Sequence, residues 1–129
     1  MNLNEPYRNE TEAIIGAAFE VMNTLGHGLL EKPYENALCV EFEERGIPFA
    51  QQLRFDIRYK HRSVGLYIPD LIAFDKVVVE AKVVEHITDQ DLGQMMNYHR
   101  ITGLAVGLII NFKRPRLEFR RVVMSENLR

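Results

Sequence analysis

The chain has 129 residues, of which 47% are hydrophobic and 26% are charged, with a formal net charge of −2. This length and composition predict one domain over residues 1–129 and exclude a disordered chain. The longest uncharged apolar run, residues 101–110, has about half the roughly twenty residues that a membrane span needs. We find no apolar signal segment and expect a cytoplasmic protein. The single cysteine, Cys39, excludes intramolecular disulfides and cysteine-based zinc sites.

Charge is unevenly distributed along the chain. Residues 1–50 hold nine acidic and three basic side chains, whereas residues 51–129 hold nine acidic and thirteen basic ones. A basic segment of this kind can hold phosphates, although it can also be a solvated surface strand. The densest basic segment contains Lys113, Arg114, Arg116, Arg120 and Arg121.

Helical periodicity predicts two helices in the first third of the chain. The first covers residues 10–25, with Asn9 as the N-cap of a capping box and Gly26 at the C-terminal end. The second begins near Pro33, which is tolerated in a first helical turn, and it ends at Gly46.

The pattern then changes to that of strands. Residues 53–60 alternate apolar and polar side chains, which predicts a strand with one solvent-exposed face. After a turn at residues 61–63, two apolar strands are expected over residues 66–74 and 77–84, joined by a short turn.

The last third is predicted to form a helix and two strands. Thr88 is a favourable N-cap for a helix that Gly103 ends, residues 104–111 form a continuous apolar run typical of a buried strand, and residues 117–124 follow as a strand. The order helix, helix, three strands, helix, two strands predicts an α/β (α+β) fold in which helices flank a mixed sheet.

Three charged side chains interrupt the apolar strands in the middle of the chain. They are Asp70, which follows Pro69, and Glu80 with Lys82. Strand alternation places Glu80 and Lys82 on one face. If Asp70 lies opposite Glu80, a hard divalent cation such as Mg²⁺ or Mn²⁺ would relieve the repulsion between the carboxylates. A buried ion pair with Lys82 is the alternative.

This hypothesis requires one hairpin register. A two-residue loop would place Asp70 opposite Ala81, on the other face from Glu80. A site therefore needs a three-residue loop with Ala73 opposite Val77, or a compensating bulge.

The predicted helices carry further polar side chains at helical spacing. Glu31 and Tyr34 follow Gly28 near the start of the second helix, and Gln94 and Tyr98 share one face of the third. The alternatives are core tyrosines with hydrogen-bonded hydroxyls, a first-turn glutamate favoured by the helix dipole, and a solvated glutamine.

Together these residues resemble the PD-(D/E)xK nuclease superfamily and, more narrowly, the small GxxExxY proteins, over residues 10–124. The Gln-x-x-x-Tyr element is similar to that of the exonuclease branch. The resemblance implies a restriction-endonuclease-like αβββαβ core. It also implies metal-dependent hydrolysis of phosphodiester bonds in nucleic acid, with DNA as the expected substrate.

Residue roles also follow from the resemblance. Asp70 and Glu80, with the backbone carbonyl of Ala81, would ligate Mg²⁺ or Mn²⁺, and Glu31 would contribute directly or through water. Lys82 would orient or activate the attacking water. The residues expected to contact substrate, from the resemblance and from the basic segment, are Gln94, Tyr98, Tyr34, Lys113, Arg114 and Arg116.

A noncatalytic module that binds nucleic acid or protein and retains this fold is the alternative function. The net charge of −2 and the short chain favour it. A chain this small has little surface with which to surround a duplex, so an active form could be a homodimer or use a protein partner. The turn around Pro115 is expected to lie away from the carboxylates.

Overall fold

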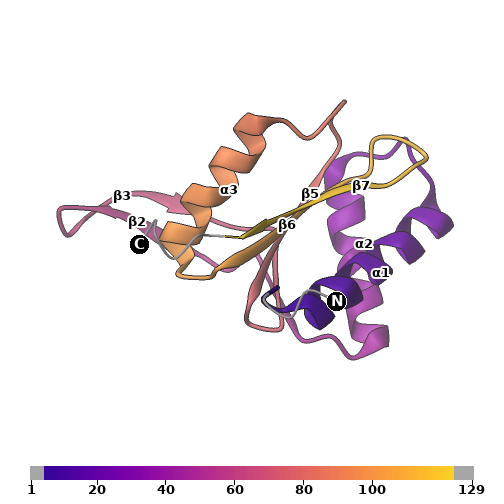
Figure 1. Ribbon diagram of the computed structural model, residues 1–129, viewed down its shortest axis with the longest axis horizontal. Coiled ribbons are helices and arrows are strands. Elements are labelled where there is room, and N and C mark those ends of the chain that lie inside the picture. The colour runs from indigo at the N-terminus through magenta and orange to yellow at the C-terminus, as the bar shows by residue number, and fades with distance from the viewer. Residues whose placement is uncertain (1–4, 124–129) are drawn as a thin grey trace.

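The computed structural model describes residues 5–123, which form three helices and seven strands (Figure 1). The helices are α1 (Arg8–Leu25), α2 (Glu31–Arg45) and α3 (Asp89–Thr102). The strands are β1 (Phe49–Gln51), β2 (Phe55–Tyr59), β3 (Arg62–Tyr67), β4 (Leu71–Ala73), β5 (Val77–Lys82), β6 (Val106–Asn111) and β7 (Glu118–Val123).

Five strands form a mixed sheet in the order β1-β4-β5-β6-β7, while β2 and β3 pair as a separate hairpin. In the large sheet β5 and β6 are parallel, and the other neighbours are antiparallel. Helices α1 and α2 cover one face of this sheet and α3 covers the other (Figure 1). This is the predicted mixed sheet flanked by helices, and it is consistent with a restriction-endonuclease-like core.

The continuous apolar runs of β5 and β6 follow from burial on both faces. Val79 and Leu108 belong to the cluster formed with α1 and α2, whereas Val78 and Ile109 pack with Met95 of α3. A strand covered on both faces gains from apolar side chains at every position, so it shows no alternation.

The register between β4 and β5 is the one that the acidic pair requires. Ala73 pairs with Val77 across a three-residue turn whose first two residues have positive φ (59° and 57°). The next pairs along the ladder lead to Asp70 opposite Glu80. The register prediction is therefore confirmed.

The first helix begins earlier than predicted. Helix α1 starts at Arg8, and its N-cap is Tyr7, which makes no side-chain capping hydrogen bond. The capping box predicted at Asn9 is wrong, because Asn9 already lies inside the helix. The helix end at Gly26 and the N-cap at Thr88 are confirmed, the latter as a complete capping box.

The strand predicted over residues 66–74 is broken in two. Strand β3 ends at Tyr67 and β4 begins at Leu71, with Pro69 between them. Proline has no amide hydrogen to donate to a strand ladder, and here the chain leaves the small hairpin for the large sheet.

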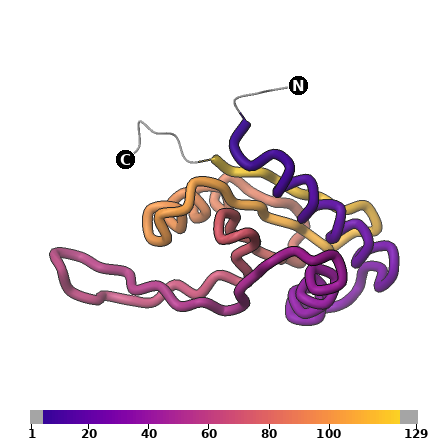
Figure 2. Tube along the Cα trace, turned by 90° about the horizontal axis from the view of Figure 1, so that it is seen from below, coloured from indigo at the N-terminus to yellow at the C-terminus, as the bar shows by residue number. Residues whose placement is uncertain are grey.

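The edge strand β1 has no counterpart in the prediction, because three residues are too few to show a period. The strand predicted over residues 117–124 is β7, and Met124 lies outside the described residues. None of the helices in residues 5–123 is long and apolar enough to cross a membrane. Figure 2 shows the β2–β3 hairpin extending away from the rest of the molecule.

Candidate functional site

Asp70 and Glu80 lie against each other where the chain enters β4, beside the middle of β5. The backbone N–H of Asp70 donates to Glu80 Oε2 at 3.1 Å, and the backbone N–H of Ala81 donates to Asp70 Oδ2 at 2.9 Å. Glu80 is in register with Ile109, which packs against α3, so the pair lies on the α3 side of the sheet. The main chain therefore fixes both carboxylates in one place.

Each carboxyl group has a raised pKa. Burial raises the pKa of Asp70, and the negative charge of Glu80 raises it further. Burial also raises the pKa of Glu80, in opposition to its hydrogen bonds and to the positive charge of Lys82. At neutral pH the pair therefore favours a shared proton or a bound cation.

Lys82 lies two residues beyond Glu80, on the same face of β5, and it is half-buried. The end of β5 is fixed by the backbone N–H of Phe112, which donates to the Lys82 carbonyl at 2.8 Å. The structure thus brings together four of the predicted residues: Asp70, Glu80, Ala81 and Lys82.

Two stacked tyrosines border the acidic pair. The Tyr67 hydroxyl donates to Glu80 Oε1 at 2.9 Å, and its ring stacks on Tyr98 of α3 with centroids 3.7 Å apart and 12° between the planes. Burial, and then the charge of Glu80, raise the pKa of both hydroxyls. Tyr98 is a predicted site residue, whereas Tyr67 is not, since a tyrosine in an apolar run is typical of a core.

The side chains of two other predicted helical residues, Gln94 and Glu31, do not hydrogen-bond to the acidic pair. Gln94, one turn before Tyr98, is exposed, and its side chain makes no hydrogen bond with any residue in 5–123. Glu31 is exposed at the first position of α2, and its carboxylate likewise has no hydrogen-bond partner in that range.

Tyr34 is fully buried and holds the turn between α1 and α2. Its hydroxyl donates to the Gly26 carbonyl at 2.6 Å and accepts from the Leu29 N–H at 3.3 Å, while its ring stacks on Phe112. Full burial leaves no surface for a ligand, which corrects the expectation that Tyr34 contacts substrate. Tyr34 therefore fits the alternative given in the sequence analysis, a core tyrosine with a hydrogen-bonded hydroxyl.

Glu35 is the acid of α2 whose charge acts on Asp70 and raises its pKa. Its buried carboxylate accepts hydrogen bonds from Gln51 Nε2 and Gln52 Nε2, both at 2.8 Å, and from Lys32 Nζ at 3.2 Å. Burial raises the pKa of Glu35, but these hydrogen bonds outweigh burial and bring the pKa below its ordinary value. Glu35 is therefore a charged, buried acid near the pair.

Gln52 connects Glu35 to Asp70. Its side chain bonds to Glu35, its backbone N–H donates to the Asp70 carbonyl at 3.1 Å, and its φ is 59°. A polar residue just before a predicted strand is typical of a loop, so the sequence carries no signal for this link.

The oxygen donors at the acidic pair fit a hard divalent cation. Within residues 5–123 no three or more His, Cys, Asp and Glu side chains are grouped to hold a metal. Mg²⁺, however, is commonly bound by one or two carboxylates and keeps several waters. Asp70 and Glu80 supply two carboxylates that backbone N–H groups hold side by side. The donor set therefore suits Mg²⁺ or Mn²⁺ better than a soft metal.

The predicted basic contacts Lys113, Arg114 and Arg116 are exposed in the turn between β6 and β7. The residue before them, Phe112, bonds to the Lys82 carbonyl, so the turn begins beside the end of β5. Parallel pairing of β5 and β6 thus places the turn beyond Lys82, whereas Glu80 lies two residues further back along β5. The expectation that the turn lies away from the carboxylates stays a prediction.

Two of these cations already have an anionic neighbour. Arg114 Nη2 lies 3.0 Å from Glu85 Oε2, and Lys113 Nζ lies 3.9 Å from Glu85 Oε1. Arg116 makes no ion pair with any residue in the described range. All of these side chains are exposed, so the pairs are weak and can open.

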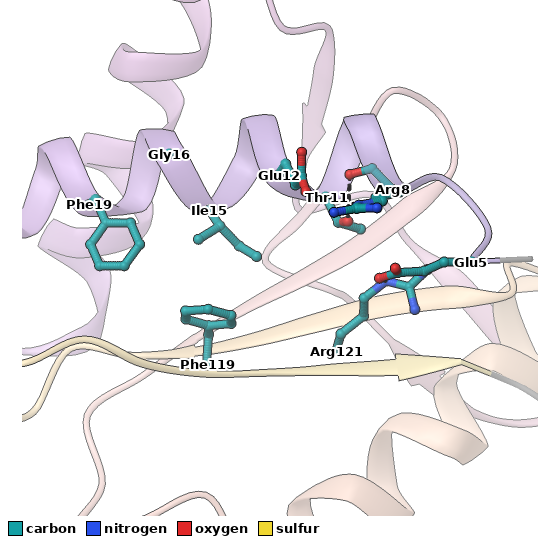
Figure 3. Close-up of a pocket in the computed structure, with 9 residues that line it drawn as sticks. All are labelled: Glu5, Arg8, Thr11, Glu12, Ile15, Gly16, Phe19, Phe119 and Arg121. Carbon is teal, nitrogen blue, oxygen red and sulfur yellow. Dashed lines mark hydrogen bonds and ion pairs between the residues drawn. The ribbon is translucent and has the colours of Figure 1, made fainter. Parts of the chain in front are cut away.

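A separate pocket of about 540 Å³ lies between α1 and β7 (Figure 3). Arg8 and Arg121 lie toward one end, and Phe19 meets Phe119 edge to face at the other. Phe119 is in register with Ile110, which packs with α1 and α2. This pocket is therefore on the opposite face of the sheet from the acidic pair.

Comparison with known proteins identifies the family. A family model described as the PD-(D/E)XK nuclease superfamily matches residues 8–122. The crystal structure of SSO0001 is similar, with a TM-score of 0.55 and 13% sequence identity over 92% of this chain and 59% of that chain. This likeness shows the fold alone, and the chain spans less than two thirds of SSO0001. A search of curated proteins finds no match. Since the family model matches most of its length, the chain belongs to the PD-(D/E)XK nuclease superfamily.

Proposed function

We propose that this protein is a nuclease that hydrolyses phosphodiester bonds with the help of Mg²⁺ or Mn²⁺, and that its substrate is DNA. Membership of the superfamily suggests a nuclease. The observation that carries the proposal for this chain is the Asp70–Glu80 pair, which backbone hydrogen bonds hold together next to Lys82. Residues 1–129 act as one domain in this proposal, and the pattern of Gly28, Glu31 and Tyr34 supports a further assignment, to the small GxxExxY proteins.

Asp70, Glu80 and the backbone carbonyl of Ala81 would hold the cation. When bound, a divalent ion lowers the pKa of a coordinated water and offsets negative charge that develops on the phosphate oxygens. Lys82 directs a positive charge to the same place and orients the attacking water. Tyr67 keeps Glu80 in position through its hydrogen bond to Oε1.

We assign to Glu35, rather than Glu31, the role of the helical acid. Glu35 is buried and its charge acts on Asp70, whereas Glu31 is exposed. Its hydrogen bonds keep it charged, so it can hold a water of the metal shell. Tyr98 and Gln94, on one side of α3, and the turn with Lys113, Arg114 and Arg116 would contact the substrate backbone.

A cleavage assay tests this function. The wild type is incubated with single-stranded, duplex and branched DNA and with RNA, in the presence of Mg²⁺, Mn²⁺ or a chelator. We expect cleavage that requires the metal and that Glu80→Gln lowers at least about 100-fold. Mutation of a residue that only supports a metal ligand can already lower activity by about this factor, and loss of the ligand itself should cost at least as much. Glu35→Gln should also lower it, while Glu31→Gln, the same change on the same helix, should not.

Two results would contradict the proposal. Cleavage by Glu80→Gln at the wild-type rate would remove the acidic pair from the reaction. Binding of nucleic acid that ignores metal, with no cleavage of any probe, would identify the noncatalytic module instead. Sedimentation of the same samples shows whether the active form is a homodimer.

A further inference from the structure

Residues 53–67 form a two-stranded projection, called the arm here, that is built from β2 and β3 (Figures 1 and 2). It packs at its base and where β2 passes α3. Tyr67, which pairs with Phe55 at the base, is the one buried residue in the two strands. The rest of the arm is open to solvent on both sides or only half-buried, so it contributes little to the core.

The arm is strongly basic in a chain that is acidic overall. Its formal charge is +3, whereas the whole chain carries −2. Arg58 lies 3.4 Å from Asp56, the single acid of the arm, but the other cations form no ion pair with any residue in 5–123. The unpaired cations are Arg54, Lys60 and Arg62.

Apolar side chains are exposed between these cations. Tyr59 is 63% exposed and Val64 is 60% exposed, and the Lys60 ammonium lies 5.3 Å from the centre of the Tyr59 ring. Cations that alternate with an exposed aromatic ring are the combination that proteins use to hold a nucleic-acid strand. Tyr59 and Val64 bury little surface in the folded chain, so a ligand on the arm would cover apolar surface that is otherwise exposed.

The arm leads directly into the acidic site. Strand β3 runs from Arg62 near the tip to Tyr67, whose hydroxyl is bonded to Glu80. At about 3.3 Å per residue, the five steps between them span roughly 17 Å. One turn of duplex DNA is about 34 Å long, so the tip can reach phosphates within about half a turn of a bond held at the acids.

We propose that the arm holds the phosphodiester backbone of the nucleic-acid substrate through Arg54, Lys60 and Arg62. This inference rests on the proposed function and adds a second surface for the same substrate. A second copy of the chain is a poorer occupant, because two arms of charge +3 repel each other. Charged side chains on the arm strands also disfavour edge-to-edge pairing.

Binding measured without metal tests the arm independently of cleavage. Fluorescence anisotropy in a chelator follows labelled duplex DNA, single-stranded DNA and RNA of equal length over a series of salt concentrations. The test variant combines Arg54→Gln, Lys60→Gln and Arg62→Gln. The control combines Arg8→Gln, Arg45→Gln and Lys76→Gln, which changes net charge equally on exposed residues elsewhere.

We expect the arm variant to bind at least tenfold more weakly than the wild type at low salt. The slope of log affinity against log salt should become flatter by about two to three units, because three phosphate contacts are lost. The control should bind within about twofold of the wild type. The probe that loses most affinity identifies whether the arm holds DNA or RNA, and duplex or single strand.

Three results would overturn the inference. They are no measurable binding of any probe by the wild type, equal losses in the two variants, and an unchanged salt slope in the arm variant. A change in sedimentation of the arm variant without a change in binding would make the arm a contact between copies instead. If the wild type binds through the arm but never cleaves with Mg²⁺ or Mn²⁺, the inference stands and the nuclease proposal fails.

Discussion

The burial of Asp70 and Glu80 side by side makes the metal-free protein less stable than it could be. Both carboxyl groups have raised pKa values, with burial as the main cause. A raised pKa in the folded state means that folding favours the protonated acid over the charged one. A metal site built from these acids is therefore formed at the expense of stability, which a bound cation would restore.

Replacing Asp70 by Asn should separate stability from activity. The amide oxygen of Asp70→Asn can still accept from the Ala81 N–H, while its NH₂ can donate to Glu80. We expect a gain of about 1–2 kcal/mol without metal near pH 8, after allowance for the partial exposure of this side chain, and a melting temperature higher by roughly 3–8 °C. Cleavage should be lost.

The pH dependence of this gain has a defined sign. The contribution of Asp70 to wild-type stability is fully present below its unfolded-state pKa, near pH 4, and is lost as pH rises toward its folded-state value of about 8. The advantage of Asp70→Asn should therefore be near zero at about pH 4 and grow up to about pH 8. Thermal melting in a chelator at several pH values measures it. Glu44→Gln, on an exposed side chain of α2, is the control. An advantage that is equal at all pH values would show that the buried negative charge of Asp70 is not its cause.

The sequence predicts some of these residues because charge is conspicuous in an apolar strand. Asp70, Glu80 and Lys82 stand out for this reason. Glu35 does not, because it lies among polar residues of α2 and looks like part of a solvated face. Its burial depends on Gln51 and Gln52, sixteen and seventeen residues away, and no local pattern reports such a contact.

At the scale of the elements, the closeness of α3 to β6 brings Tyr98 to the acidic pair. Gly107 of β6 allows this approach, since a Cβ there would lie 2.6 Å from Met95 Sδ and 3.0 Å from His99 Cε1. His99 is buried beneath the helix and its Nε2 lies 3.2 Å from the Val122 carbonyl. Helix α3 thus packs against both β6 and β7.

A methyl group at Gly107 should push α3 away from the sheet. We expect Gly107→Ala to destabilise the protein by about 1–3 kcal/mol, the usual range for an overpacked core. Its cleavage rate should also fall, because Tyr98 shifts relative to Tyr67. Urea denaturation and the cleavage assay measure the two effects.

Gly93 provides a matched control within α3. A Cβ at Gly93 would meet nothing within 4 Å, and this residue is exposed in the helix. Gly93→Ala should therefore stabilise the protein by up to about 1 kcal/mol, since alanine is the better helix former. Equal stability of Gly107→Ala and the wild type would show that α3 does not pack closely against β6 at Gly107.

Prediction of the elements from sequence is good where a repeating pattern is long. The three helices and the β4–β5 register were accessible from periodicity and from the requirement that Asp70 face Glu80. The break at Pro69 was not, because apolar residues on both sides give the appearance of one strand. Which sheet a hairpin joins depends on long-range pairing, so the separate arm was not accessible either.

At the scale of the whole molecule, charge is unevenly distributed between segments of the chain. The first 50 residues, which include α1 and α2, hold nine acidic and three basic side chains, a net charge of −6, while the arm and the β6–β7 turn are basic. The acidic pair lies on the α3 side of the sheet, next to Tyr67 at the base of the arm, and the charge of Glu35 on α2 also acts on Asp70. A polyanion is therefore attracted to the arm and to the turn and repelled by the acidic surface of α1 and α2.

Glu85 weakens this attraction locally, because it lies within 4 Å of both Lys113 and Arg114. The glutamate is 73% exposed, so its ion pairs contribute little to folding and compete with phosphates for the same cations. Glu85→Gln should strengthen binding of duplex DNA by roughly two- to fivefold at low salt and make the salt dependence steeper, by up to about two units for two released cations. Melting temperature should hardly change. Glu44→Gln alters net charge equally on an exposed side chain of α2 that forms no ion pair with Lys113 or Arg114, so its effect on binding should be much smaller. Equal effects of the two variants would mean that only the overall charge matters, and that the turn holds no phosphate.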